Sequence, residues 1–255
     1  MSEIIPLFYD HSCGRSILTA WSEKEATPGG PQSIVSLCKK SGLKQCFLVS
    51  NNFHTFLEAW KNLKSEGIQL CFGLELIFVE DAKIHTPESR YSEHKVLIFA
   101  KNYAGYKDLI KIYTACYSNL DNKYEIFRFD YKQLADFWTG NLIFVIPYWD
   151  SFLHRNKLGF NSNIIPTIPL NAVIFREVGS DLPFSSIIDE SIDKFNHNKS
   201  YEEVKIKTIY YEKSDDFKSY MVFRAIKNRA TFHAPNCEYL CSNKFSFEEW
   251  EKLTK

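Results

Sequence analysis

The sequence predicts an α/β fold, and a single α/β barrel is the natural arrangement for 255 residues. Apolar strand-like segments alternate with amphipathic helical segments along most of the chain, which favours parallel strands joined by helices over a β-sandwich. Hydrophobic residues make up 45% of the chain, enough for a sizeable core. Because no long linker, internal repeat or low-complexity segment is visible, we expect one domain spanning residues 1–255.

Seven apolar segments are predicted to be strands, because each is short, contains β-branched or aromatic residues and is bounded by polar or turn residues. In chain order they are Ile4–Tyr9, Gln45–Ser50, Gln69–Val79, His94–Lys101, Asn141–Pro147, Asn171–Val178 and Glu203–Tyr211. A helical segment follows most of them. As in other α/β barrels, the carboxyl ends of the strands should therefore carry any functional site.

Six segments have the apolar spacing of amphipathic helices. They are residues 31–42, 53–67, 103–119, 184–196, 215–228 and 245–253. The helix at 53–67 is expected to carry four apolar residues on one face, namely Phe56, Leu57, Trp60 and Leu63. Polar residues, glycine and proline predict loops at Glu23–Gly30, Glu80–Glu93 and Leu158–Pro169.

The charges of the chain balance, with 31 Lys and Arg residues against 31 Asp and Glu residues. A protein without net charge has no overall field that attracts nucleic acid, so we expect DNA contact only through a local patch or a partner. No run of about 18 apolar residues and no signal-like segment is visible. We therefore expect no membrane insertion and no secretion, and a cytoplasmic location.

The seven cysteines are scattered, and most are expected to be buried free thiols in a reducing compartment. Only His233, Cys237 and Cys241 lie close together in the sequence. Their spacing would bring them together on a helix, but Pro235 and Asn236 favour a loop, and structural zinc sites need four ligands. Zinc binding is therefore the less favoured interpretation of this segment.

The most specific motif lies at residues 94–117, HKVLIFAKNYAGYKDLIKIYTACY, where a His-led strand is followed by Ala-Lys-Asn, Gly-Tyr and a helix. It resembles the PHP (polymerase and histidinol phosphatase) domain, specifically the amino-terminal PHP domain of the bacterial DNA polymerase III alpha subunit. The segments GIQLCFGLEL at 67–76 and NLIFVIPYW at 141–149 are similar to neighbouring strands of that domain. Residues 215–232 and 245–253 are similar to its last helix and closing element.

This resemblance implies a distorted (β/α)7 TIM-like barrel of the PHP type. Active members of the family bind up to three metal ions at the carboxyl ends of the strands, through histidines, aspartates and a glutamate. The metals activate water against a phosphodiester or a phosphomonoester. Some versions linked to polymerases are proofreading 3′–5′ exonucleases.

The amino-terminal metal motif of the family is only partly kept. The family pattern His-x-His falls on Tyr9, Asp10 and His11. A tyrosine therefore replaces the first ligand, while the second is kept. The following pattern, Ser-x-x-x-Ser-x-x-Asp, falls on Ser12, Ser16 and Thr19, with a hydroxyl where a carboxylate is expected.

The other motifs have lost most of their ligands. The pattern Thr-Asp-His-Gly falls on Val49, Ser50, Asn51 and Asn52. The bridging glutamate is matched by Glu75, the histidine of the next strand by His94, and the Cys or His after the fifth strand by Tyr148. The last pattern, Asn-Asp-x-His, falls on Lys207, Thr208, Ile209 and Tyr210, to within one residue.

Three candidate metal ligands remain, His11, Glu75 and His94. A metal cluster needs more ligands than these, so we expect no cofactor, with zinc or manganese at low occupancy as the alternative. We interpret both histidines as vestigial. Glu75 lies in an apolar strand, so it must be paired or protonated if buried, and His94 is its expected neighbour.

Tyrosines stand at three former ligand positions, Tyr9, Tyr148 and Tyr210. A tyrosine fills volume and satisfies one hydrogen bond without needing a cation. We therefore predict that these rings converge on the space that the metals would occupy and fill it.

The favoured function is that of a catalytically inactive PHP domain in a DNA polymerase III alpha subunit, with a structural role in bacterial DNA replication. Its expected partners are the rest of that subunit and a proofreading exonuclease subunit or a sliding clamp. The alternative is a phosphoesterase or 3′–5′ exonuclease with one metal on His11, Glu75 and His94. Asp10 would be a further ligand, but strand alternation makes it a turn or capping carboxylate.

A third interpretation is a plain interaction module that binds a sliding clamp or nucleic acid. Residues 53–64 and 227–233 mix basic and aromatic side chains. Aromatic residues at helical spacing usually belong to the core, which makes this interpretation weaker than the first.

Overall fold

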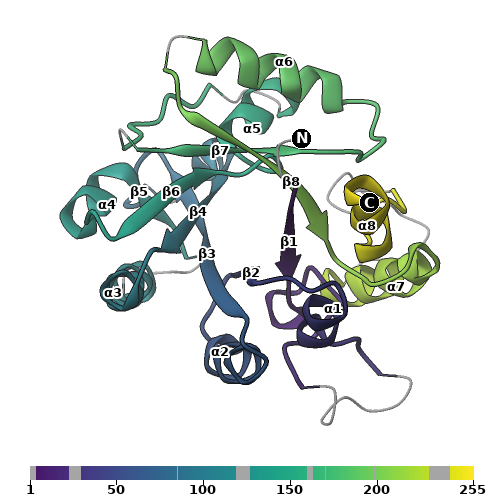
Figure 1. The fold of residues 1–255 in the computed structure, drawn as a ribbon. Helices are drawn as coiled ribbons and strands as arrows, with labels where there is room; N and C mark the ends of the chain where they lie inside the picture. Colours follow the sequence, from purple (N-terminus) through teal and green to yellow (C-terminus); the bar gives the residue numbers. More distant parts are fainter. Residues whose placement is uncertain are drawn as a thin grey trace. The chain divides into compact units, whose positions relative to one another are not determined.

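The computed structural model describes residues 4–22, 30–84, 86–118, 127–159, 163–169, 171–197, 199–229 and 242–255 (Figure 1). Its strands are β1 (Ile5–Tyr9), β2 (Gln45–Ser50), β3 (Gln69–Val79), β4 (His94–Ala100), β5 (Phe129–Asp130), β6 (Leu142–Ile146), β7 (Val173–Glu177) and β8 (Glu202–Ile209). All seven predicted strands are present with bounds that shift by at most two residues at either end. The short strand β5 was not predicted.

The strands are paired in the order β2-β1-β8-β7-β6-β4-β3-β5, and β2 also pairs with β3. The predicted α/β class of a TIM-like barrel is thereby confirmed. One expectation is wrong, because β4 runs antiparallel to both β3 and β6. In the described part of the β3–β4 connection, the helical element is a short 3-10 helix, η2 (Glu88–Ser92). A parallel pair needs a longer crossover, usually through an α-helix.

The α-helices are α1 (Ile34–Lys40), α2 (Phe56–Ser65), α3 (Tyr103–Ser118), α4 (Tyr131–Phe137), α5 (Phe152–Leu158), α6 (Ser185–Asn196), α7 (Phe217–Lys227) and α8 (Phe247–Thr254). The six predicted helices are among them. The short helices α4 and α5 were missed, although each has a sequence signal. Asp130 and Gln133 form a capping box at α4, and Ser151 caps α5.

The described residues form two compact units. Unit 1 comprises Met1–Phe72, Glu177–Pro183 and Lys205–Lys255, and unit 2 comprises Gly73–Arg176 and Phe184–Val204. The strands β3, β7 and β8 each contribute residues to both units. The expected single domain stays a prediction.

The core of unit 1 lies between β1, β2 and the helices α1, α2 and α8. Phe8 and Ile209 pair in register on neighbouring strands and pack in this core with Phe247 and Trp250. Ser33 and Ser246 cap α1 and α8 by accepting backbone hydrogen bonds from the first turn. The alternation of strand side chains then turns Leu7 and Tyr9 to the opposite face of β1.

Unit 2 is built on the antiparallel strands β3, β4 and β6. Two glycines are needed for close packing there. A Cβ on Gly73 would lie 2.5 Å from the Phe99 ring, and a Cβ on Gly105 at the start of α3 would overlap the carbonyl oxygen of Asn141. The Ala-Gly-Tyr sequence of the 94–117 motif is therefore explained by helix α3 lying against the start of β6.

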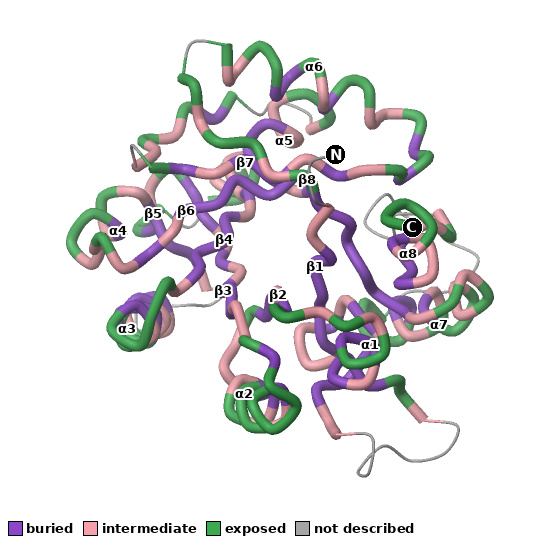
Figure 2. The backbone as a smooth tube through the Cα atoms, viewed as in Figure 1, coloured by how far each residue is buried: buried purple, intermediate pink, exposed green. Residues whose placement is uncertain are grey.

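Helix α2 differs from the prediction in which residues it buries. Ala59 and Leu63 are buried, whereas Leu57 is 68% exposed and Trp60 is 44% exposed. Figure 2 shows the buried residues concentrated along the strands, with exposed residues along the helices. Trp60 is therefore an exception to the expectation that aromatic residues at helical spacing usually belong to the core. Among the described residues, no helix is long and apolar enough to cross a membrane.

Candidate functional site

The loop after β1 is organised by the carboxylate of Asp10, which is fully buried. One oxygen accepts hydrogen bonds from the Ser12 hydroxyl at 2.8 Å and the Cys13 backbone at 3.2 Å. The other accepts from the Thr55 hydroxyl. Asp10 thus caps the 3-10 helix η1 (His11–Cys13), which confirms its predicted role as a capping carboxylate.

His11 begins this short helix and is half-buried in unit 1. Its backbone N–H donates to Leu18 at 2.8 Å, and its ring lies edge-on to Trp21 at a centroid distance of 6.3 Å. Its Nδ1 atom is buried and has no hydrogen-bond partner among the residues that the structure describes. The His11 ring is therefore held by packing. Its predicted vestigial role as a former metal ligand stays a prediction.

Tyr9 and Tyr210 of unit 1, two of the residues that the resemblance aligns with metal ligands, are in contact. Their ring centroids are 5.5 Å apart, and both residues are at least 95% buried. Tyr210 also stacks on Tyr220 of α7 at 5.3 Å, with the rings within 8° of parallel. Burial raises the pKa of the Tyr210 hydroxyl, so the ring stays neutral and acts as packing.

The loop after β1 is anchored to Tyr210 and to α7. The Ser16 hydroxyl donates to the backbone carbonyl of Tyr210 at 2.8 Å, and Arg224 donates to the carbonyl of Gly14 at 2.7 Å. Gly14 has a φ of +73°, which favours glycine, and a Cβ there would meet Lys227. Ser16 therefore serves as a structural hydroxyl in the described loop.

The segment after β2, where the family has a Thr-Asp-His-Gly motif, forms a polar turn. Ser50 is buried at the end of the strand, and Asn51 is exposed. Asn52 donates to the Asn51 side chain at 2.7 Å and accepts from the backbone of His54 at 2.9 Å. These contacts explain the asparagines as turn residues.

In unit 2, Glu75 and His94 lie on neighbouring strands but point to opposite faces. Glu75 pairs with Leu97 in the antiparallel register, whereas His94 pairs with Phe78, three residues further along β3. Because side chains alternate along a strand, an odd separation places Glu75 and Phe78 on opposite faces. The predicted pairing of Glu75 with His94 is therefore wrong.

His94 is a buried, hydrogen-bonded residue with 1% exposure. Its Nδ1 donates to the Ser92 carbonyl at 2.8 Å, which leaves Nε2 to accept from the Tyr131 hydroxyl at 2.7 Å. Burial lowers the pKa of His94 to about 4. The ring is therefore neutral at physiological pH, and both nitrogens are used within unit 2.

Glu75 is paired with a lysine. The Lys95 ammonium lies 3.6 Å from a Glu75 carboxylate oxygen and 2.9 Å from Asp150. The Lys95 backbone N–H also donates to the Asp150 carbonyl at 2.8 Å. Lys95 pairs with Ile77 across the strands, which puts it on the same face as Glu75.

Tyr148 also belongs to unit 2 and is 2% exposed. Its hydroxyl donates to the carbonyl of Ser185 at the start of α6 at 3.0 Å, and its ring lies 4.6 Å from that of Trp149. It therefore fills volume with a satisfied hydroxyl, as expected of a tyrosine at this position. Its convergence with Tyr9 and Tyr210 stays a prediction.

A buried charged pair in unit 1 was missed from the sequence. Lys207 donates to the carbonyls of Val178 and Gly179 at 2.8 and 2.7 Å and lies 3.4 Å from Glu177. Glu177 in turn accepts from the Thr208 hydroxyl at 2.5 Å. Burial raises the pKa of Glu177 and lowers that of Lys207. Charged residues inside the apolar segments VIFREV and EVKIKTIYY were the available signal.

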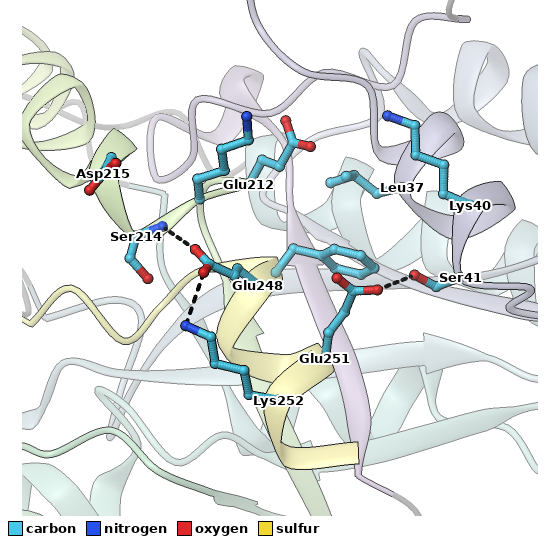
Figure 3. A pocket seen from close by; sticks show the side chains of 11 residues that line it. Leu37, Lys40, Ser41, Glu212, Ser214, Asp215, Glu248, Glu251 and Lys252 are labelled. Carbon is cyan, nitrogen blue, oxygen red and sulfur yellow. Dashed lines mark hydrogen bonds and ion pairs between the residues drawn. The ribbon is translucent and has the colours of Figure 1, made fainter. Parts of the chain in front are cut away.

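A cavity of about 440 Å³ opens in unit 1 beside α1 and α8 (Figure 3). Glu248 accepts from the Ser214 backbone and pairs with Lys252 at 2.9 Å, while Glu251 accepts from Ser41 at 3.1 Å. The residues that line it are Leu37, Lys40, Ser41, Glu212, Lys213, Ser214, Asp215, Phe247, Glu248, Glu251 and Lys252. None of the sequence-predicted site residues is among them, and the mixed charges give no field of a single sign.

The donor atoms at the motif positions do not fit the metal cluster that the resemblance implies. Tyr9 and Tyr210 pack on each other, His94 uses both ring nitrogens, and Glu75 already has an ammonium beside it. Within the described ranges, no three His, Cys, Asp or Glu side chains are grouped as a metal ion requires. The segment with His233, Cys237 and Cys241 lies outside the described residues.

The strand order and the surrounding helices define an α/β protein of the TIM-like barrel class. The family model of the PHP domain matches residues 27–161, just over half of the chain. This chain therefore belongs to the PHP domain family, a phosphoesterase-type superfamily. The matched segment contains Glu75, His94 and Tyr148, whereas Tyr9, His11 and Tyr210 lie outside it. No curated protein matches the chain.

Proposed function

We propose that this chain is a PHP domain in which side-chain packing has replaced the metal centre, and that it acts as a structural and interaction domain without hydrolytic activity. The observation that carries this proposal is the contact of Tyr9 with Tyr210 at 5.5 Å. Both stand where the family motifs have histidine ligands. Aromatic rings packed at this distance stabilise each other and leave no donor set for a metal between them.

We further propose that the parent protein is a bacterial DNA polymerase III alpha subunit. The support is the resemblance of residues 94–117, in which β4 is followed by α3 and Gly105 permits the close approach to Asn141. In this role the domain would support the remaining regions of the subunit, and it would act in the cytoplasm. A proofreading exonuclease subunit or a sliding clamp would be its external partner.

Helix α2 offers a surface suited to such a partner. Its exposed Leu57 and Trp60 lie on one side with Lys61 and Lys64, and the Lys64 ammonium is 4.6 Å from the Trp60 ring centroid. An exposed tryptophan is typical of protein interaction surfaces, and Leu57 adds a second exposed apolar side chain beside it. Contact with DNA would then be indirect.

Hydrolysis assays test the proposal against its alternative, a reduced phosphoesterase or 3′–5′ exonuclease. Purified protein would be incubated with single-stranded DNA and with a simple phosphate monoester, each with added Mn²⁺ or Zn²⁺. The Glu75→Gln variant is the matched control, because it removes the carboxylate at the bridging position. We expect the same background rate for both proteins. Hydrolysis by the wild-type protein that is lost in the variant would establish the alternative.

A further inference from the structure

The ion triad of unit 2 places a cation beside Glu75, the residue at the family's bridging carboxylate position. The Lys95 ammonium lies 3.6 Å from Glu75 and 2.9 Å from Asp150. The side chains are partly buried, with exposures of 19% for Lys95, 10% for Glu75 and 30% for Asp150. Charges in such an environment interact more strongly than charges in open solvent.

The backbone fixes this arrangement as well as the side chains do. Lys95 and Asp150 are joined by the bond from the Lys95 N–H to the Asp150 carbonyl at 2.8 Å. Asp150 has a φ of +57°, a left-handed conformation that few residues other than glycine adopt. This turn directs the Asp150 carboxylate back to the Lys95 ammonium, which is shared with Glu75.

We propose that the Lys95 ammonium is a built-in counter-ion that keeps divalent metal ions from binding at Glu75 and Asp150. This inference rests on the proposed function, and it identifies Lys95 as the residue that prevents metal binding in unit 2. One positive charge held between two carboxylates neutralises part of their charge and repels a second cation. Lys95 lies on the same face of the sheet as Glu75, whereas His94 points to the other face. The cation in contact with Glu75 is therefore the Lys95 ammonium, and His94 is not placed to hold a metal ion there.

Removal of the ammonium should therefore convert a closed site into a cation-binding one. Without Lys95, the two carboxylates that now share its ammonium, Glu75 and Asp150, would lose that cation. Carboxylate oxygens are ligands that suit Mn²⁺. Lys95→Met keeps an unbranched side chain that is one atom shorter and removes its charge. Lys95→Gln is a second variant that keeps a polar end group.

The experiment is a Mn²⁺ titration of the full chain by calorimetry, with thermal unfolding at each Mn²⁺ concentration. We expect Lys95→Met and Lys95→Gln to bind Mn²⁺ roughly tenfold or more tightly than the wild-type protein. Added Mn²⁺ should raise the melting temperature of these variants, and the double variant Glu75→Gln/Lys95→Met should lose both effects. Lys194→Met is the matched control, because it leaves a single exposed carboxylate, Glu190, without its lysine.

Two results would overturn the inference. In the first, folded Lys95→Met and Lys95→Gln would bind Mn²⁺ no better than the Lys194→Met control. In the second, the wild-type protein would itself bind Mn²⁺ through Glu75 with Lys95 in place. The first result leaves the proposed absence of hydrolysis intact, since hydrolysis is measured on the wild-type protein, so the two proposals fail separately.

Discussion

Unit 1 and unit 2 differ in the surroundings of the residues that align with the metal ligands of the family. In unit 1, Tyr9 and Tyr210 occupy two such positions and pack ring against ring. In unit 2, the carboxylate at Glu75 is kept and lies beside the ammonium of Lys95. The comparison teaches that a metal site has two components to replace, its volume and its charge. Under the proposed function, aromatic packing replaces the volume in unit 1, and an internal ion triad replaces the charge in unit 2.

The largest predicted change in stability is in unit 1, where removal of a buried ring leaves a cavity. Tyr210→Ala should lower the free energy of unfolding by about 3–5 kcal/mol, because the ring is buried against Tyr9, Tyr220 and Phe245. Tyr210→Phe, which keeps the ring, should cost much less. Urea denaturation of the purified variants measures both values.

Tyr103→Ala is the matched control for this experiment, because Tyr103 is 71% exposed on α3. Its cost should stay within about 0.5 kcal/mol. If Tyr210→Ala lowered the free energy of unfolding no more than this control, the packed rings of unit 1 would not stabilise the fold. The claim that aromatic packing replaces the metal centre in unit 1 would then be contradicted.

A smaller effect is expected in unit 2, and it depends on pH. The pKa of His94 is lowered to about 4 in the folded protein, whereas an unfolded histidine titrates near 6.5. The folded state therefore disfavours protonation, so the stabilisation is complete above pH 6.5 and is lost as the pH falls toward 4. The total loss is about 3 kcal/mol for this group.

This dependence is measured by comparing urea denaturation of the wild-type protein and His94→Gln between pH 7 and pH 4. The advantage of the wild-type protein at pH 7 should shrink steadily as the pH is lowered. His197→Gln, at an exposed position after α6, serves as the control and should show no such trend. A constant difference between wild type and His94→Gln across this range would show that the buried ring does not titrate as described.

The sequence was most informative about the strands, because buried strands are short apolar runs and their bounds depend on local residues. The side of the sheet on which a residue lies depends on register, and a shift of one residue reverses it. That is why Glu75 and His94 were expected to be neighbours, while Lys95, the next residue, is the one that faces Glu75.

Long-range pairs were also beyond the sequence. Glu177 and Lys207 are 30 residues apart and meet only because β7 and β8 are neighbours in the sheet. The exposure of Trp60 could not be predicted either, because the apolar face of α2 is chosen by what packs against it. Two kinds of local signal were visible and overlooked: the capping residues of α4 and α5, and the charged residues within the apolar segments that contain Glu177 and Lys207.

Metal content of the wild-type protein tests the central claim, that packing and internal charge have replaced the metal centre. Protein purified without chelators would be dialysed against excess Mn²⁺ or Zn²⁺, then against metal-free buffer, and examined by elemental analysis beside Glu75→Gln. The account predicts far less than one ion per chain in both proteins. One or more ions retained by the wild-type chain and lost in Glu75→Gln would contradict it.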